Sequence, residues 1–168
     1  LSEVGVEFHD APDALERFAG AGADVQGERV RFPHGLCRSL VQATAPSQFT
    51  QVARNRANDV VFGGQGTIFA PAYGSPFVRD LDGGRRYGTI EDFRNFVKLA
   101  YASPWLHHSG GTVCEPVDVP VNKRHFDMIY AHLRYSDKPF MGSVTRPERA
   151  RDTVDMARIV FGHDFVEE

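Results

Sequence analysis

Apolar runs and helical patterns alternate in the second half of the chain, and this order limits the possible folds more than any other feature. The apolar runs are WLHHSGGTVCE at residues 105–115 and KPFMGSVT at residues 138–145. Each is followed by an amphipathic pattern, over about 122–135 and about 147–161. Strands that alternate with helices in this way run parallel and are joined by right-handed crossovers. The order therefore predicts part of a barrel or of a doubly wound sheet.

The first half of the chain has a different pattern, which predicts a mixed region of short elements. Helices are expected from Pro12 to about Ala19 and from Leu36 to a point before Pro46, with a hairpin around residues 25–32 between them. Short β runs separated by Asn, Gly and Pro follow, as QFTQVAR, DVVFGG, TIFAPA and PFVRD. We expect an N-terminal α+β region over residues 1–88 and the first βα units of a barrel over residues 89–168.

A helix is expected at the start of this second region. Thr89-Ile90-Glu91-Asp92 resembles a capping box with Asp in place of the usual Glu or Gln. Phe93, Val97 and Ala100 then recur on one helical face, and Pro104 ends the pattern. The spacing predicts a helix over about 90–101.

Composition and charge exclude several classes of protein. The chain has 168 residues, 42% of them hydrophobic, and a net charge of −3 without a basic stripe, so a nucleic-acid-binding protein is not expected. Its two cysteines form no disulfide framework, and no apolar run approaches the roughly 20 residues of a membrane helix. These features predict one globular protein of the cytoplasm, and they leave its oligomeric state, including a homo-oligomer, open.

The expected strand ends carry residues that fill a core poorly. Glu115 ends the first apolar run, and Met141, Gly142 and Ser143 end the second. In parallel α/β folds the carboxyl ends of strands face the ligand. Glu115 could balance a cationic substrate or accept a proton there, or it could equally cap the next helix or pair with Lys123 or Arg124.

Aromatic residues near these ends suit a cationic ligand. Tyr73, Phe77, Trp105 and Phe140 could hold a quaternary ammonium through cation–π attraction worth about 0.5–2 kcal/mol for each ring. Core packing is the alternative for each of them, and it is the more common role of a large aromatic residue.

Two adjacent histidines, His107 and His108, suggest a hydrogen-bond donor rather than a metal site. Neighbouring residues on a strand point to opposite faces, and no third ligand stands at a diagnostic spacing, so no metal site is expected. One of the pair could face the site and donate to an anionic substrate group. His125 and His132, seven residues apart on a helix, are expected to be surface or packing residues, and Cys114 a buried structural thiol.

Several motifs together resemble the trimethylamine methyltransferase family, and the likeness runs nearly from end to end. They are VGVEF (residues 4–8), AGA (residues 21–23), RVRFP (residues 29–33), GTIEDF (residues 88–93), CEPVDVP (residues 114–120), RHFDMIYA (residues 124–131) and DKPFMG (residues 137–142).

The resemblance implies a fold, an activity and a partner. It implies a TIM (β/α)8 barrel with an N-terminal α+β extension, of which this chain would be the first third. It also implies transfer of a methyl group from a methylated amine, such as trimethylamine or glycine betaine, to the cobalt of a corrinoid carried on a separate protein. The pyrrolysine that marks the true trimethylamine enzymes would fall beyond Glu168.

The candidates Glu115, His107 and Met141 follow from position at the strand ends, and the aromatic candidates from their fit to a quaternary ammonium, rather than from the family motifs. The catalytic candidates are Glu115 and His107, and the substrate-binding candidates are Tyr73, Phe77, Trp105, Phe140, Met141 and Gly142.

Two alternatives remain open at this point. Because 168 residues cannot close an eight-stranded barrel of about 250 residues, the chain could be a non-catalytic truncated barrel that binds such amines. The other is an unrelated α/β metal-dependent hydrolase that uses His107, His108 and Glu115.

Overall fold

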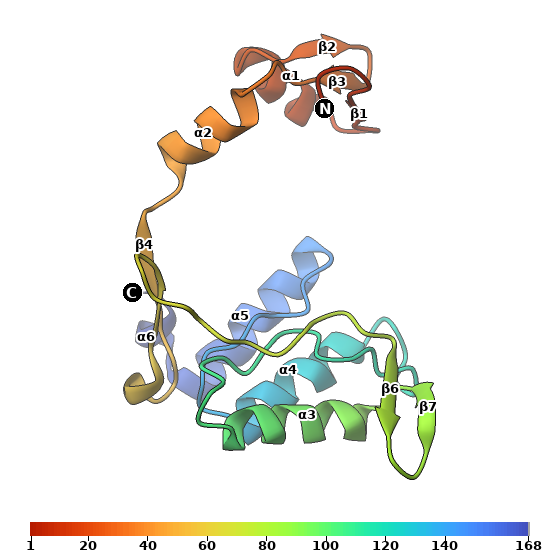
Figure 1. Ribbon diagram of the computed structural model, residues 1–168, viewed down its shortest axis with the longest axis vertical. Helices are drawn as coiled ribbons and strands as arrows, with labels where there is room; N and C mark the ends of the chain where they lie inside the picture. Colours follow the sequence, from red (N-terminus) through yellow and green to blue (C-terminus); the bar gives the residue numbers. More distant parts are fainter. Residues whose placement is uncertain (168) are drawn as a thin grey trace. The chain divides into compact units, whose positions relative to one another are not determined.

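The chain divides into two compact units in the computed structural model, which describes residues 1–167 (Figure 1). The units are Leu1–Ser47 and Gln48–Glu168. Each is described by itself below. The boundary between them separates the second helix from the first β run that follows it.

The N-terminal unit is a small three-stranded antiparallel sheet with two helices, in the strand order β1-β3-β2. The expected hairpin is confirmed, because Val25 of one strand lies opposite Val30 of the next. Val30 is fully buried, and the ring of Phe18 packs against those of Phe8 and Phe32 with centroids 4.7 and 5.3 Å apart. The elements are β1 (Val6–Glu7), α1 (Pro12–Gly20), β2 (Asp24–Gln26), β3 (Arg29–Arg31) and α2 (Leu36–Thr44).

The second unit contains two antiparallel hairpins and the longer helices. The β runs expected at QFTQVAR, DVVFGG and PFVRD are confirmed as strands, whereas TIFAPA is not a strand. Its elements are β4 (Gln48–Gln51), η1 (Arg56–Asn58), β5 (Val60–Gly63), β6 (Phe77–Asp80), β7 (Gly84–Tyr87), α3 (Ile90–Ala102), α4 (Arg124–Tyr135), α5 (Pro147–Phe161) and α6 (His163–Glu167).

Helix α3 begins at the capping box that the sequence predicts. The Thr89 side chain accepts from the backbone N–H of Asp92 at 3.2 Å, and the Asp92 carboxylate accepts from the backbone N–H of Thr89 at 2.8 Å. Arg86 on β7 also donates to this carboxylate at 2.5 and 2.8 Å. The first turn of α3 is therefore held at its backbone and by an ion pair.

The core of the second unit lies between α3, α4 and the chain that precedes α4. Phe93 and Val97 of α3 and Met128 and Ala131 of α4 are nearly or fully buried, as their helical spacing requires, and they pack with Cys114. Figure 1 shows α3 and α4 side by side, with α5 beyond α4. This packing fixes the chain near residues 113–115.

Three segments of the second unit run side by side in the same direction: residues 69–75, 107–115 and 139–141, called here the parallel segments. The first two are joined by backbone hydrogen bonds from His107 to Phe69, from Gly74 to Thr112 and from Glu115 to Ser75, at 2.7–2.9 Å. Rising residue numbers in one match rising numbers in the other, as in a parallel pair.

The third segment continues the arrangement. Ser109 N–H donates to the carbonyl of Pro139 at 2.8 Å, and Met141 N–H donates to the carbonyl of Gly110 at 2.9 Å. Helix α4 forms the connection between the second and third segments. The order expected of βα units is therefore present in outline.

The two strands predicted at residues 105–115 and 138–145 are nevertheless wrong as regular strands, because both stretches are irregular. Gly110 has a φ of 98°, and its N–H donates to His108 Nδ1 at 2.9 Å instead of to a neighbouring carbonyl. Pro139 has no N–H to give to a ladder. The mixed α/β class is confirmed, but the strands form only antiparallel hairpins and a small antiparallel sheet, and residues 1–167 close no barrel.

The helices do not include a membrane span. Among residues 1–167, none is both long enough and apolar enough to cross a bilayer.

Candidate functional site

The ends of the second and third parallel segments face one small cavity, called here the end pocket. Glu115 comes from the second segment, and Ser143 comes from the chain just beyond the third. The N-terminal turns of α4 and α5 supply the rest of the wall, and the cavity has a volume of about 150 Å³. Its main polar lining residues are Glu115, Arg124, His125, Ser143, Thr145 and Arg149.

Glu115 is held in an ion pair. Arg124 Nη1 lies 2.9 Å from Glu115 Oε2, and the guanidinium also donates to the carbonyl of Val119 at 3.3 and 3.4 Å. The Glu115 side chain is 38% exposed and that of Arg124 is 18% exposed. Of the roles left open for Glu115, pairing with Arg124 is therefore observed, and it fixes the carboxylate at the pocket wall.

His125 forms a second polar pair beside the pocket. Its Nε2 lies 2.7 Å from Asp152 Oδ2 on α5, and the side chain is only 4% exposed. The other ring nitrogen, Nδ1, is buried and has no hydrogen-bond partner among the described residues. This histidine is therefore a packing residue of α4, but one with an unused polar atom.

Met141 points elsewhere and contacts Tyr73. The Tyr73 hydroxyl lies 3.5 Å from the Met141 sulfur, which joins the first parallel segment to the third. Gly111 lies between them, because a Cβ there would lie 3.4 Å from Met141 Cβ and 3.8 Å from a Tyr73 ring carbon. Gly142 packs close to α5, where a Cβ would be 3.1 Å from Thr153. Glu115 and Met141 thus belong to neighbouring segments but do not face the same cavity.

The other aromatic candidates are in separate places. Phe140 stacks on His132 with the ring centroids 5.4 Å apart, Phe77 packs against Tyr87 in the β6–β7 hairpin, and Trp105 is 78% exposed. The described residues therefore bring Tyr73 and Met141 together but do not gather the aromatic candidates into a cage.

His107 and His108 point to different surroundings, as expected of neighbours in extended chain. His107 is exposed, and its Nδ1 accepts from the Phe69 N–H at 3.1 Å. His108 is 1% exposed, accepts from Gly110 N–H at Nδ1 and donates from Nε2 to Gln51 Oε1 at 3.0 Å. Burial lowers the pKa of His108 to about 4, so its imidazole is neutral at pH 7.

His132 is the second buried neutral histidine. Its Nε2 donates to the carbonyl of Gly111 at 2.9 Å, so Nδ1 accepts from the Ser109 hydroxyl at 2.8 Å. Burial lowers the pKa of His132 to about 4. The sequence did not predict that His108, Ser109 and His132 would fix the backbone of the second parallel segment, because their partners are distant in the sequence or lie on its backbone.

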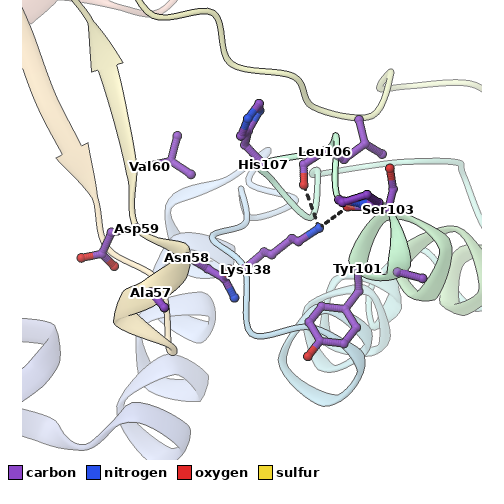
Figure 2. Close-up of a pocket in the computed structure, with 11 residues that line it drawn as sticks. Ala57, Asn58, Asp59, Val60, Tyr101, Ser103, Leu106, His107 and Lys138 are labelled. Atoms are coloured by element: carbon purple, nitrogen blue, oxygen red, sulfur yellow. Dashed lines mark hydrogen bonds between the residues drawn. The ribbon is translucent and has the colours of Figure 1, made fainter.

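A larger cavity of about 530 Å³ lies between the end of α3 and the chain around η1 (Figure 2). Lys138 reaches into it, and its ammonium donates to the carbonyls of Ala100, Ser103 and Leu106 at 2.7–2.9 Å. His107 and Tyr101 also line this cavity. The Lys138 ammonium therefore caps the C-terminal end of α3, where the helix dipole is negative. Desolvation lowers the pKa of this lysine. The family motif DKPFMG contains this lysine, but its capping role could not be predicted.

Two other candidate chemistries find little support in the structure. Burial raises the pKa of the Cys114 thiol to about 12, so this cysteine is a structural residue and not an activated nucleophile. Within residues 1–167, no group of three His, Cys, Asp or Glu side chains is placed to hold a metal ion. The proposed hydrolase site of His107, His108 and Glu115 is therefore not assembled.

Comparison with known proteins identifies the family. The family model described as trimethylamine methyltransferase (MTTB) matches residues 1–168. The chain belongs to this family. Glycine betaine methyltransferase of Desulfitobacterium hafniense (strain Y51) is 48% identical over 162 residues, which cover 96% of this chain and 33% of that protein. This member of the trimethylamine methyltransferase family thus spans about a third of the length of that relative.

Proposed function

We propose that this chain forms the N-terminal part of a corrinoid-dependent methyltransferase. The whole enzyme would transfer a methyl group from a methylated amine, such as trimethylamine or glycine betaine, to the corrinoid of a separate partner protein. The match of the family model to the entire chain carries this proposal. The 48% identity to a glycine betaine methyltransferase supports a quaternary amine as the substrate.

The arrangement of the parallel segments is consistent with this role. In barrel enzymes the active site lies where the parallel strands end and the following helices begin. Glu115 and Ser143 lie at such a position in this chain. The corrinoid supplies the group that accepts the methyl, and the protein has to hold the amine, orient it and exclude water.

Glu115 is the residue that we propose to act on the cationic amine. Its Oε2 is paired with Arg124, and its second oxygen, Oε1, has no hydrogen-bond partner among the described residues. This oxygen remains available to offset the positive charge of a methylated ammonium. Tyr73, Met141 and His107 do not line the end pocket, so their contacts with the amine stay predictions. The same holds for Phe77, Trp105, Phe140 and Gly142, which lie in separate places.

Methyl transfer by the full-length enzyme tests the proposal. The enzyme is mixed with its cognate corrinoid protein in the reduced state and with a panel of methylated amines, and corrinoid methylation is followed by its absorption spectrum. We expect methylation from at least one amine. The 168-residue chain alone is expected to be inactive. A full-length enzyme that methylates the corrinoid from none of the amines contradicts the proposal.

Substitution of Glu115 tests its role in the same assay. Glu115→Gln keeps the shape of the side chain but removes its charge, and we expect kcat/KM to fall by at least about tenfold. Glu148→Gln, which changes an exposed residue in the first turn of α5, is the matched control and should leave kcat/KM unchanged. Equal kcat/KM values for the two variants would show that Glu115 does not act on the substrate.

A further inference from the structure

We propose that the end pocket binds an ammonium ion that keeps an N–H bond, such as protonated trimethylamine, in preference to a quaternary ammonium ion, with His125 Nδ1 as the acceptor. The choice of a methylated amine as the ligand rests on the function proposed above, but the requirement for an N–H comes from the pocket itself. Three observations carry the proposal: a buried acceptor without a partner, a free carboxylate oxygen and a wall without surplus positive charge.

His125 presents a hydrogen-bond acceptor to the pocket. Its Nε2 lies 2.7 Å from Asp152 Oδ2, and a carboxylate at this distance accepts the ring proton. Because the hydrogen bond of one imidazole nitrogen decides the state of the other, Nδ1 of the neutral ring keeps its lone pair. The residue is 3% exposed, it lines the pocket, and its Nδ1 has no partner among the described residues. A buried acceptor without a donor costs free energy, so this atom indicates a ligand with a hydrogen to donate.

Glu115 supplies a second acceptor on the same wall. Its Oε2 accepts from Arg124 at 2.9 Å, and its Oε1 has no hydrogen-bond partner within residues 1–167. A carboxylate oxygen and an imidazole lone pair both attract the hydrogen of an ammonium ion, because that hydrogen carries part of the positive charge. The two acceptors therefore favour a donor that is also a cation.

The charges around the pocket balance, so a cation is not excluded. Glu115 and Asp152, which lies against His125, supply two carboxylates. Arg124 and Arg149 supply two guanidinium groups, and Arg149 directs its Nη atoms at a hydroxyl and a carbonyl of the protein, at 2.7 and 3.1 Å. The neutral imidazole adds no charge to this sum.

The N–H bond separates two kinds of methylated amine. Protonated trimethylamine has the same charge as tetramethylammonium and a hydrogen in place of one methyl group, so it alone can donate to His125 Nδ1. Tetramethylammonium would place a methyl group against this nitrogen and leave it without a donor. The cavity has a volume of about 150 Å³, several times that of one water molecule, so the hydrogen bond rather than the space decides between these two small cations.

This selectivity has a consequence for methyl transfer. When a quaternary ammonium gives up a methyl group to the reduced corrinoid, the electron pair of the broken C–N bond stays on nitrogen, and the tertiary amine takes a proton from water. The product then carries the N–H that its substrate lacks. In an enzyme for a quaternary amine the end pocket would hold the product more tightly than the substrate, and in an enzyme for a tertiary amine it would hold the substrate.

Nuclear magnetic resonance of the 168-residue chain tests the proposal without any methyl transfer. The titrations are run at about pH 8, where trimethylamine is protonated and an imidazole side chain is in general neutral. Trimethylammonium chloride and tetramethylammonium chloride are added separately at constant ionic strength, and the shifts of the His125 ring nitrogens are followed. We expect saturable shifts with trimethylammonium and binding at least about tenfold tighter than that of tetramethylammonium. Equal affinities for the two cations, or no saturation with either, overturn the proposal.

A third ligand separates the charge from the hydrogen bond. tert-Butanol also has three methyl groups and one hydrogen to donate, but it is neutral. We expect it to bind more weakly than trimethylammonium, because Glu115 favours a cation. Equal binding would show that the pocket accepts any donor and would overturn the assignment to an ammonium ion.

Variants of His125 locate the acceptor. His125→Gln keeps an amide donor for Asp152 but has no acceptor at the position of Nδ1, so the preference for trimethylammonium over tetramethylammonium should disappear. His34→Gln, which changes an exposed histidine of the N-terminal unit, is the matched control and should bind as the wild type does. A preference that persists in His125→Gln contradicts the proposal. If that variant fails to fold, the comparison of the two cations on the wild type still decides.

Amine binding and methyl transfer fail separately. The titrations use no corrinoid, so a negative result there leaves the methyltransferase proposal intact. A full-length enzyme that binds trimethylammonium but methylates the corrinoid from no amine would contradict the proposed function and leave the pocket assignment intact.

Discussion

Two buried histidines, His108 and His132, satisfy buried polar atoms of the parallel segments. His108 and His132 each use both ring nitrogens, with one donating and the other accepting. For His108 this pair of bonds requires the neutral imidazole, because a proton on Nδ1 would face the N–H of Gly110. The sequence predicted that His107 and His108 would point to opposite sides, but it could not predict their partners, because those partners come from distant parts of the chain.

Acid should destabilise the protein through these histidines. The pKa of His132 is about 4 in the folded protein and about 6.5 in an unfolded chain, so the unfolded state binds more protons between these values. The stability that neutral His132 contributes to the folded protein is fully present above pH 6.5 and is lost as the pH falls toward 4. The loss is of the order of 3 kcal/mol.

Denaturant unfolding between pH 7 and pH 4 measures this effect. His132→Gln lacks the titrating group, so the difference in unfolding free energy between wild type and variant should narrow as the pH falls. A constant difference across this range would show that His132 is not a neutral buried group.

Asp92 should contribute more to the free energy of unfolding than its exposed neighbour Glu91 does. Its carboxylate accepts from the backbone N–H of Thr89 and from Arg86, and Arg86 holds the pKa of Asp92 well below its usual range. Asp92→Ala should lower the free energy of unfolding by about 1 kcal/mol, a typical value for a lost cap, and lower Tm by about 2–4 °C. Glu91→Ala, one residue away, makes only surface pairs and should change Tm little. Calorimetry that found equal Tm values for both variants would contradict the role of the capping box.

At the scale of elements, helices were predicted better than strands. The helices at 90–102, 124–135 and 147–161 follow their apolar spacing and local start signals, which a short stretch of sequence contains. The parallel segments depend on contacts between stretches that are far apart, and Gly110 and Pro139 interrupt their pairing. Their direction could be predicted from the βα order, but their irregular backbone could not.

Lys138 should be required for the stability of the α3 end. Its ammonium donates to three carbonyls at the end of α3 and in the chain after it, and Lys138→Met would leave these partly buried acceptors without a donor. We expect the free energy of unfolding to fall by about 1–3 kcal/mol. Lys123→Met, which changes an exposed lysine, is the control. Chemical denaturation in which both variants match the wild type would exclude the capping role.

At the scale of the whole molecule, the family likeness extends over both compact units. The family likeness was predicted from motifs spread over nearly the entire chain, and the family model confirms it over residues 1–168. The proposed boundary near residue 88 stays a prediction about where the barrel part begins. The end pocket could be foreseen only in position, because Arg149 and His125 had no distinguishing sequence pattern.

The second unit should fold without the first. Its buried cluster of Val78, Phe93, Val97, Val113 and Met128 lies entirely within residues 48–168. A chain of residues 48–168 should show a cooperative thermal transition and keep the helical circular dichroism of α3, α4, α5 and α6. A non-cooperative transition would show that this unit requires residues 1–47.

The two cysteines differ enough to give the chain one chemical handle. Cys37 is exposed on α2, whereas Cys114 is fully buried with a raised pKa. A maleimide dye or spin label should therefore attach at Cys37 alone in the native protein, without prior mutagenesis. Reaction at the second thiol would then report that the core around α3 and α4 has opened.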